Sequence, residues 1–278
     1  MLELVLVAAV ALGSNADTTV SIERGQGVAI ENFSGRLIVR AWDRPEVRFE
    51  TEGRDEANVN VARSASELSF SPDRRWRNRS VTTSVRMPAW ASLRVRGVEL
   101  NVEVEGLTDG LSVRTVEGDV RIRRVSGGVV AHTIEGVLEV EDVEGSVELF
   151  SLDDDVWVSG VRGDVSVEAG DGDIHLRGID ARNVQASTVD GAVNFEGVIW
   201  PDGRYELTTH DGDVTLEVGE GVSATVSVST FDGDFTTEFP VLLSGLNSSR
   251  ELRFTLGGGE ATIIMRAFDG EVRLVRSR

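Results

Sequence analysis

Apolar and polar residues alternate with a nine-residue period through the middle of the chain. Residues 107–178 divide into eight consecutive repeats without a gap, and the fifth and seventh positions are apolar in all eight. The sixth position is mostly polar, and alternation with a period of two is typical of a short strand with one buried face. Glycine is frequent at the third position, where it favours a turn. The pattern therefore predicts a strand and a turn in each repeat, and the first position, apolar in seven of the eight, is expected to join the core.

Neighbouring repeats differ at their ninth position. Small residues occupy it in every second repeat, at Thr115, Thr133, Ser151 and Ala169. The repeats between them carry Arg124, Asp142, Gly160 and Gly178. The true period is therefore a pair of repeats, which we call a coil. The small residues continue at Thr188, Thr209 and Thr230, as insertions lengthen the coils by one and then by three residues.

Stacking of these coils explains the pattern best. Equivalent strands would lie about 4.8 Å apart in parallel ladders, and their apolar positions would form one continuous core. A three-sided hexapeptide helix has coils of the same length, but its apolar register, counted from Val116, meets Gly128, Ser146 and Asp164. A sandwich would use antiparallel hairpins without a strict repeat. We predict an all-β fold, a parallel β-helix (β-solenoid) with about 18–21 residues per coil.

The flanks of the repeats predict capped ends. Residues 17–97 hold longer alternating runs and are expected to form N-terminal strands and a capping region, followed by the regular solenoid over residues 98–278. Near the C-terminus, residues 252–255 and 261–265 flank three glycines and suggest a hairpin-like cap, after which residues 268–272 restore the repeat. Caps are expected because open solenoid ends are exposed sheet edges. Residues 17–278 are predicted to form one continuous domain.

The N-terminal segment, residues 1–16, resembles a secretory signal. Residues 4–12 are an apolar run that is too short to span a bilayer, and Ser14-Asn15-Ala16 places small residues before a cleavage site. A buried first strand is the alternative. We therefore expect an exported protein, periplasmic, cell-surface or extracellular, without a transmembrane segment in the mature chain.

Composition narrows the functional classes. The chain has 278 residues and a formal net charge of −19, and all of its basic residues except three histidines are arginines. This acidic balance argues against nucleic acid as a partner, because phosphate binding draws on basic patches. The absence of cysteine excludes disulfides, thiolate metal sites and cysteine nucleophiles.

Three segments carry a resemblance to a known family: residues 28–49 (VAIENFSGRLIVRAWDRPEVRF), Arg86-Met87-Pro88 with Leu93-Arg94-Val95, and the recurring Thr-x-Asp/Glu-Gly-Asp-Val at residues 115–120 and 209–214. They resemble the bacterial "putative adhesin" family, an adhesin-like β-solenoid domain of unknown function. The resemblance covers nearly all of the mature chain and implies a right-handed, single-stranded β-helix. It also implies an exported or surface-associated protein, and it implies no particular activity.

An acidic residue recurs at the same turn in every coil. The row comprises Glu117, Glu135, Asp153, Asp171, Asp190, Asp211, Asp232 and Asp269. A second row two positions later comprises Asp119, Asp155, Asp173, Asp213, Asp234 and Glu271. One hypothesis is weak Ca²⁺ binding by Asp171, Asp173, Asp190, Asp211, Asp213, Asp232 and Asp234, because Ca²⁺ prefers clustered carboxylates. The alternative is turn chemistry, since Asp before Gly bonds its own backbone. No other cofactor is expected.

Two tryptophans are candidate ligand-binding residues. Trp157 occupies an outward-facing sixth position, and Trp200 lies in an insertion at residues 197–204. Exposed tryptophan can stack on sugars or anchor a protein, although packing under a loop or cap is the alternative. The basic cluster of Arg74, Arg75, Arg77 and Arg79 around Trp76 reads as a loop, and the three histidines form no metal or catalytic motif.

These observations favour a non-enzymatic binding or structural module of the cell envelope, with a glycan or protein as its partner. Weak contacts could accumulate along a repeating surface. One alternative is an envelope-stress or antimicrobial-sensing component that works through a protein partner. A polysaccharide-active β-helix enzyme is another, but it would need paired carboxylates that interrupt the repeat. The ligand, the oligomeric state and the surface attachment are left open.

Overall fold

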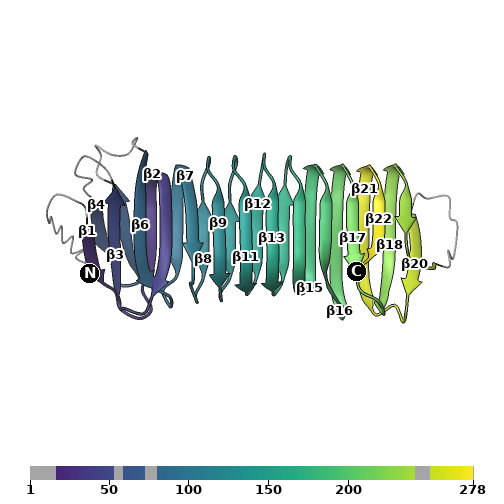
Figure 1. Ribbon diagram of the computed structural model, residues 1–278, viewed down its shortest axis with the longest axis horizontal. Helices are drawn as coiled ribbons and strands as arrows, with labels where there is room; N and C mark the ends of the chain where they lie inside the picture. The colour runs from purple at the N-terminus through teal and green to yellow at the C-terminus, as the bar shows by residue number, and fades with distance from the viewer. Residues whose placement is uncertain (1–16, 53–58, 73–79, 242–250, 278) are drawn as a thin grey trace, which may run out of the picture. The chain divides into compact units, whose positions relative to one another are not determined.

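The computed structural model describes residues 17–52, 59–72, 80–241 and 251–277, and within them the chain forms strands and no helix (Figure 1). The predicted all-β class is confirmed. The chain divides into two compact units, Met1–Gly136 and Val137–Arg278, which are described in turn. The predicted single domain over residues 17–278 and the right hand of the winding stay predictions.

The strands of the first unit are β1 (Asp17–Ser21), β2 (Gly27–Trp42), β3 (Glu46–Glu52), β4 (Val59–Arg63), β5 (Glu67–Pro72), β6 (Ser80–Pro88), β7 (Leu93–Glu105), β8 (Leu111–Arg114), β9 (Val120–Val125) and β10 (Val129–His132).

Many of the parallel strand pairs of the first unit join residues that lie one coil apart in the sequence. The two halves of β7 pair with β8 and β9, and β8 pairs in the same way with β10. The long strand β2 is itself a coil, because both of its halves pair in parallel with β7. The other side of β2 pairs with β5 and β6, so the coil that comes first in the chain lies inside the sheet. Antiparallel strands cover it further out, with β4 on β5, β3 on β6 and β1 on β3.

The strands of the second unit are β11 (Leu138–Glu144), β12 (Val147–Ser151), β13 (Val156–Arg162), β14 (Val165–Ala169), β15 (Ile174–Asp190), β16 (Val193–Asp211), β17 (Val214–Val218), β18 (Ala224–Asp232), β19 (Phe235–Thr237), β20 (Glu251–Leu256), β21 (Ala261–Asp269) and β22 (Val272–Arg276).

The second unit confirms the predicted lengthening of the coils. The offset between paired strands is two repeats where Leu138 pairs with Val156. It is one residue longer where Ile174 pairs with Val193, and three residues longer where Val193 pairs with Val214. All of these pairings are parallel. Insertions in the longer coils are absorbed as register shifts between β15 and β16, around residues 177–183.

The end of the chain departs from the sequence order. Strand β21 pairs in parallel with β16 on one side and with β18 on the other, and β22 lies in the same way between β17 and β19. The last coil is therefore inserted before the preceding one, as the yellow strands of Figure 1 show. The expected hairpin of residues 252–255 with 261–265 is wrong, because β20 pairs antiparallel with β18 instead.

The core follows the fifth and seventh positions of the repeats. Leu138, Val140, Val156 and Val158 are at most 1% exposed and stack in register from coil to coil. The first position is buried only in every second repeat, as at Val125 and Val143. Each of these two follows a residue with a left-handed backbone, Arg124 (φ 52°) or Asp142 (φ 55°), which turns the chain inward.

Candidate functional site

A buried hydroxyl shapes the tight turn of most coils. Thr209 Oγ1 donates to the carbonyl oxygen of Gly191 in the neighbouring coil at 2.8 Å, and Thr188 Oγ1 donates to that of Gly170 at 3.0 Å. Thr188 and Thr209 are themselves paired in register, as the sequence predicted for the small residues. The residue that follows each of these two threonines faces outward.

That following residue is the first position of the alternate repeats, and it is exposed. The expectation that it joins the core is wrong for these repeats, because the turn directs the side chain away from the sheet interior. In the first unit the exposed residues are Val98, Val116 and Ile134. In the second unit they are Leu152, Val189, His210, Phe268 and Phe231, with Gly170 between the first two. We call these residues the apolar row of each unit.

Three rings of the second unit's apolar row lie against one another. The ring centroids of Phe231 and Phe268 lie 4.7 Å apart with an interplanar angle of 4°, and those of His210 and Phe268 also lie 4.7 Å apart. Phe231 is 53% exposed and Phe268 is 47% exposed. Sequence reasoning did not select these phenylalanines, although each directly precedes a turn acid.

The first acidic row runs beside the apolar row, one residue further along the chain. In the first unit, Glu117 bridges Glu99 on one side and Glu135 on the other. In the second unit, Asp171 is adjacent to Asp190 and Asp190 to Asp211. The next member is Asp269 and then Asp232, which corrects the sequence order of these two. The four carboxylates from Asp190 to Asp232 are exposed.

Carboxylates of the second acidic row accept hydrogen bonds from the backbone of the neighbouring coil. Asp173 Oδ1 accepts a hydrogen bond from the backbone N–H of Ala192 at 2.8 Å, and Asp155 Oδ1 accepts one from Asp173 at 2.9 Å. Asp213 Oδ1 accepts the same bond from Glu271 at 2.8 Å. These carboxylates therefore tie each turn to the next coil, a role that differs from the bond to its own backbone expected for an Asp before Gly.

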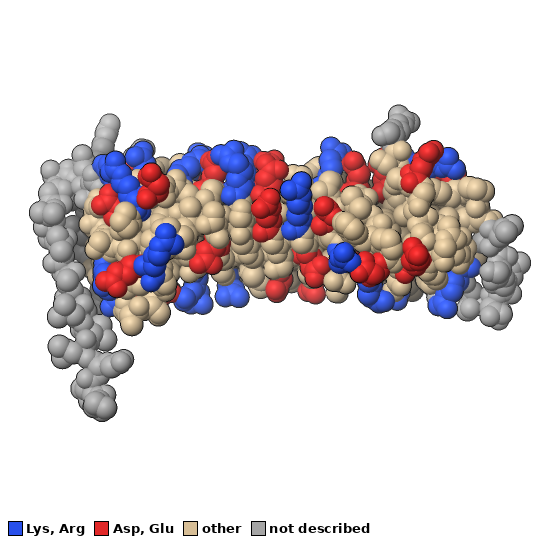
Figure 2. Space-filling model, turned by 90° about the horizontal axis from the view of Figure 1, so that it is seen from below, with Lys and Arg blue, Asp and Glu red and all other residues tan. Residues whose placement is uncertain are grey.

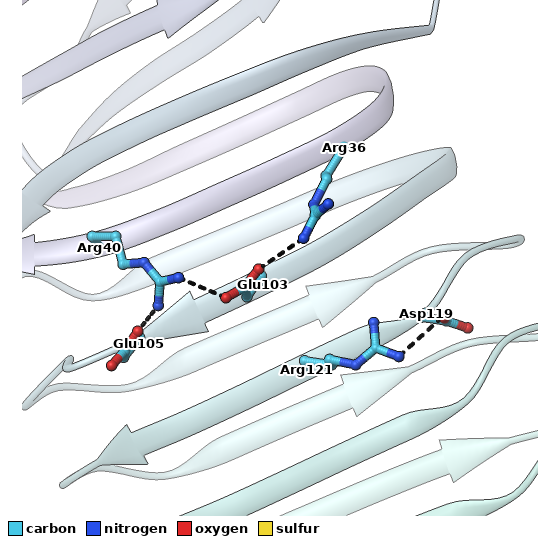
Figure 3. A network of polar contacts seen from close by, with 6 residues as sticks. All are labelled: Arg36, Arg40, Glu103, Glu105, Asp119 and Arg121. Carbon is cyan, nitrogen blue, oxygen red and sulfur yellow. Dashed lines mark hydrogen bonds and ion pairs between the residues drawn. The ribbon is translucent and has the colours of Figure 1, made fainter.

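Ion pairs join many charges on neighbouring strands, in contrast to the first acidic row of the second unit. In the first unit, Arg36 and Arg40 of β2 contact Glu103 of β7 at 3.2 and 2.7 Å, and Arg40 also contacts Glu105 (Figure 3). Burial raises the pKa of Glu103, but the hydrogen bonds and charges of both arginines outweigh burial and hold this pKa below its usual value. Figure 2 shows basic and acidic side chains interspersed over the visible face of each unit.

An open depression lies along the turns of the second unit. Its lining comprises Asp173, Asp190, Gly191, Ala192, Asp211, Gly212, Asp213 and Asp269. Ala192 interrupts the second acidic row and leaves space between its neighbours. Even so, no three His, Cys, Asp or Glu side chains of the described residues converge as a metal site would require. The predicted weak Ca²⁺ binding stays a prediction.

Neither tryptophan is a member of the apolar row or of the acidic rows. Trp157 faces outward and is 46% exposed, and its ring stacks on His175 with a centroid distance of 3.8 Å. Trp200 is half-buried, because its Nε1 donates to Asp180 at 2.8 Å and the Arg182 guanidinium lies 4.9 Å from its ring centroid. The Arg74–Arg79 cluster lies outside the described residues, as does the predicted signal segment.

A family model for Toastrack DUF4097 matches residues 37–274. The chain belongs to this Toastrack family. The match confirms the resemblance to an adhesin-like domain of unknown function. No curated protein matches the chain.

One solved structure with a detectable similarity to this Toastrack chain is described as a "putative cell adhesion protein" from Clostridium sporogenes. It covers 95% of this chain and 100% of its own, with 9% identity and a TM-score of 0.23, which is too low to support an argument. Within the part of the chain that the structure describes, no helix has the length and apolar character needed to cross a membrane.

Proposed function

We propose that this Toastrack protein is an exported, non-enzymatic binding module of the cell envelope, built as a right-handed parallel β-helix. The observation that carries the proposal is the apolar row of the second unit. Phe231 and Phe268 are about half exposed at turns where packing requires no large apolar side chain. Exposed apolar residues that line up over several coils are typical of a surface that meets a partner.

A binding role fits the acidic rows better than catalysis does. Catalytic acids and bases need different environments that push their pKa values apart. The repeat instead gives Asp190, Asp211 and Asp269 the same turn position in successive coils. A surface of equivalent sites suits many weak contacts with an extended partner.

Binding to glycan arrays and to washed envelope fractions tests this proposal. We expect retention of the wild-type protein in both Ca²⁺ and chelator, and a loss of retention in the double variant Phe231→Ser/Phe268→Ser. Trp157→Ser is the matched control, because it removes an exposed aromatic ring outside the apolar row. Absence of retention on every envelope component would contradict the proposal. Retention that chelator abolishes would instead support the Ca²⁺ hypothesis.

A further inference from the structure

The rings and the acids of the second unit form one continuous surface. His210, Phe268 and Phe231 each precede an acid of the first row, and Asp211 pairs in register with Asp269, which pairs with Asp232. The apolar and acidic side chains therefore run side by side over three neighbouring coils. We call the three rings and these three carboxylates the ring–acid surface.

The carboxylates of this surface have no basic partner among the described residues. Arg273 of β22 contacts Asp213 at 3.1 Å and also pairs with Glu271. Its hydrogen bond, together with one from Thr236, lowers the pKa of Glu271. Asp213 and Glu271 of the second acidic row thus pair with Arg273, whereas Asp211, Asp232 and Asp269 form no ion pair within the described ranges. Like charges about 5 Å apart repel, so a cationic partner would relieve this repulsion.

The neighbouring rings distinguish between kinds of cation. A hard metal ion needs several oxygens that converge on one point and gains nothing from aromatic rings. Here the carboxylates are spread along the coils, and no metal-binding group of three forms in the described residues. An arginine or lysine side chain uses both features, because its apolar stem packs on the rings while its charged head reaches the carboxylates.

We propose that the ring–acid surface binds a polypeptide segment in which arginine or lysine alternates with apolar residues. This inference rests on the proposed binding function and specifies the partner's chemistry. The net charge of −19 would also attract such a segment from a distance and speed its association. The partner's apolar side chains would contact Phe231 and Phe268 between the charged heads.

Fluorescence anisotropy with a labelled synthetic peptide tests the inference. The probe is a peptide of about twelve residues in which arginine and leucine alternate, long enough to cross three coils about 5 Å apart. One control peptide has serine in place of leucine, and another has glutamate in place of arginine. We expect the arginine–leucine peptide to bind at least about tenfold more tightly than the serine version, and the glutamate version not to bind.

Two double variants with matched controls locate the site. Phe231→Ser/Phe268→Ser is expected to weaken binding at least about tenfold, whereas Trp157→Ser changes it less than about twofold. Asp211→Asn/Asp269→Asn is expected to weaken binding at least about fivefold and to reduce its salt dependence. Its control, Glu148→Gln/Glu168→Gln, removes two exposed acids elsewhere in the unit and is expected to have little effect. Because asparagine is also accepted in turns, the Asp→Asn variant keeps the test valid if the Phe variant does not fold.

Equal binding of the leucine and serine peptides would overturn the inference, since it would reveal non-specific charge attraction alone. Unchanged peptide binding by both double variants, Phe231→Ser/Phe268→Ser and Asp211→Asn/Asp269→Asn, would overturn the inference as well. Failure of the inference is distinguishable from failure of the proposed function. An envelope-retained protein that ignores the peptide contradicts only the partner's chemistry, whereas peptide binding without envelope retention contradicts the envelope role.

Discussion

The glycine in the acidic turn is expected to be indispensable, and Gly172→Ala is the sharpest perturbation. Gly172 follows Asp171 and has a φ of +132°, a region that L residues rarely adopt. A β-carbon there would lie 2.7 Å from the carbonyl carbon and 2.8 Å from the carbonyl oxygen of Asp154 in the neighbouring coil. Both atoms belong to backbone and cannot rotate away. The substitution must therefore either strain the turn or push two coils apart.

The expected loss of stability combines the backbone strain with the weakening of a hydrogen bond between coils. A strained backbone of this kind costs about 1–3 kcal/mol. Moving the coil endangers the hydrogen bond in which the N–H of Gly172 donates to the carbonyl oxygen of Asp190 at 2.8 Å. One such backbone bond contributes about 1 kcal/mol. We therefore expect Gly172→Ala to lower the free energy of unfolding by about 3 kcal/mol.

Urea unfolding followed by circular dichroism measures this loss, with Gly219→Ala as the matched control. Gly219 lies in the same unit, and a β-carbon there would meet nothing within 4 Å. The control is expected to leave stability unchanged or to raise it by about 0.4–1 kcal/mol, because alanine restricts the unfolded chain. A loss below about 1 kcal/mol for Gly172→Ala, or a loss equal to that of the control, would refute the close stacking of the turns.

Three further predictions address charge and polarity in the second unit. Asp211→Asn/Asp269→Asn should raise the melting temperature, more strongly at low salt, because it removes neighbouring like charges; an unchanged melting temperature at low salt would contradict the unpaired row. Tyr205→Phe should destabilise the protein by about 1–3 kcal/mol in urea unfolding, because the buried hydroxyl donates to Ala181 O at 2.8 Å; a neutral effect would contradict that bond. The hydrogen bond from Arg266 is the main reason why the pKa of Glu206 lies below its usual 4.5. The contribution of Glu206 to stability is therefore complete above pH 4.5 and is lost as the pH falls through the lowered pKa. Arg266→Gln should reduce the loss of the urea midpoint over this acidic pH range. An unaltered pH dependence would contradict the ion pair of Glu206 with Arg266.

Local periodicity predicted the ladders because neighbouring coils follow one another in the chain. The offset of two repeats between Leu138 and Val156, and the longer offset between Val193 and Val214, were both readable from the spacing of the small and apolar residues. The order of the last coils was not readable. Phe231-Asp232-Gly233-Asp234 and Phe268-Asp269-Gly270-Glu271 are nearly equivalent copies, and only long-range pairing decides which one lies next to β16.

The exposed apolar row was missed although the sequence holds its signal. Val116 follows the small residue Thr115 and is 38% exposed, whereas Val125 follows the left-handed Arg124 and is 1% exposed. Both valines occupy the same position of the nine-residue repeat. Hydrophobicity alone cannot separate them, because the direction of the side chain is set by the backbone of the preceding residue.

An apolar residue exposed in successive coils is an aggregation risk, and the acid that follows it provides a physical remedy. Two copies of the chain that approached through this edge would bring Asp211, Asp232 and Asp269 against the same carboxylates of the other copy. Such contact between like charges costs several kcal/mol, so the rings of two copies are kept apart. The same arrangement leaves the rings accessible to a segment that carries positive charge. Solubility of the chain and selectivity for a basic partner therefore arise from the same alternation of ring and acid.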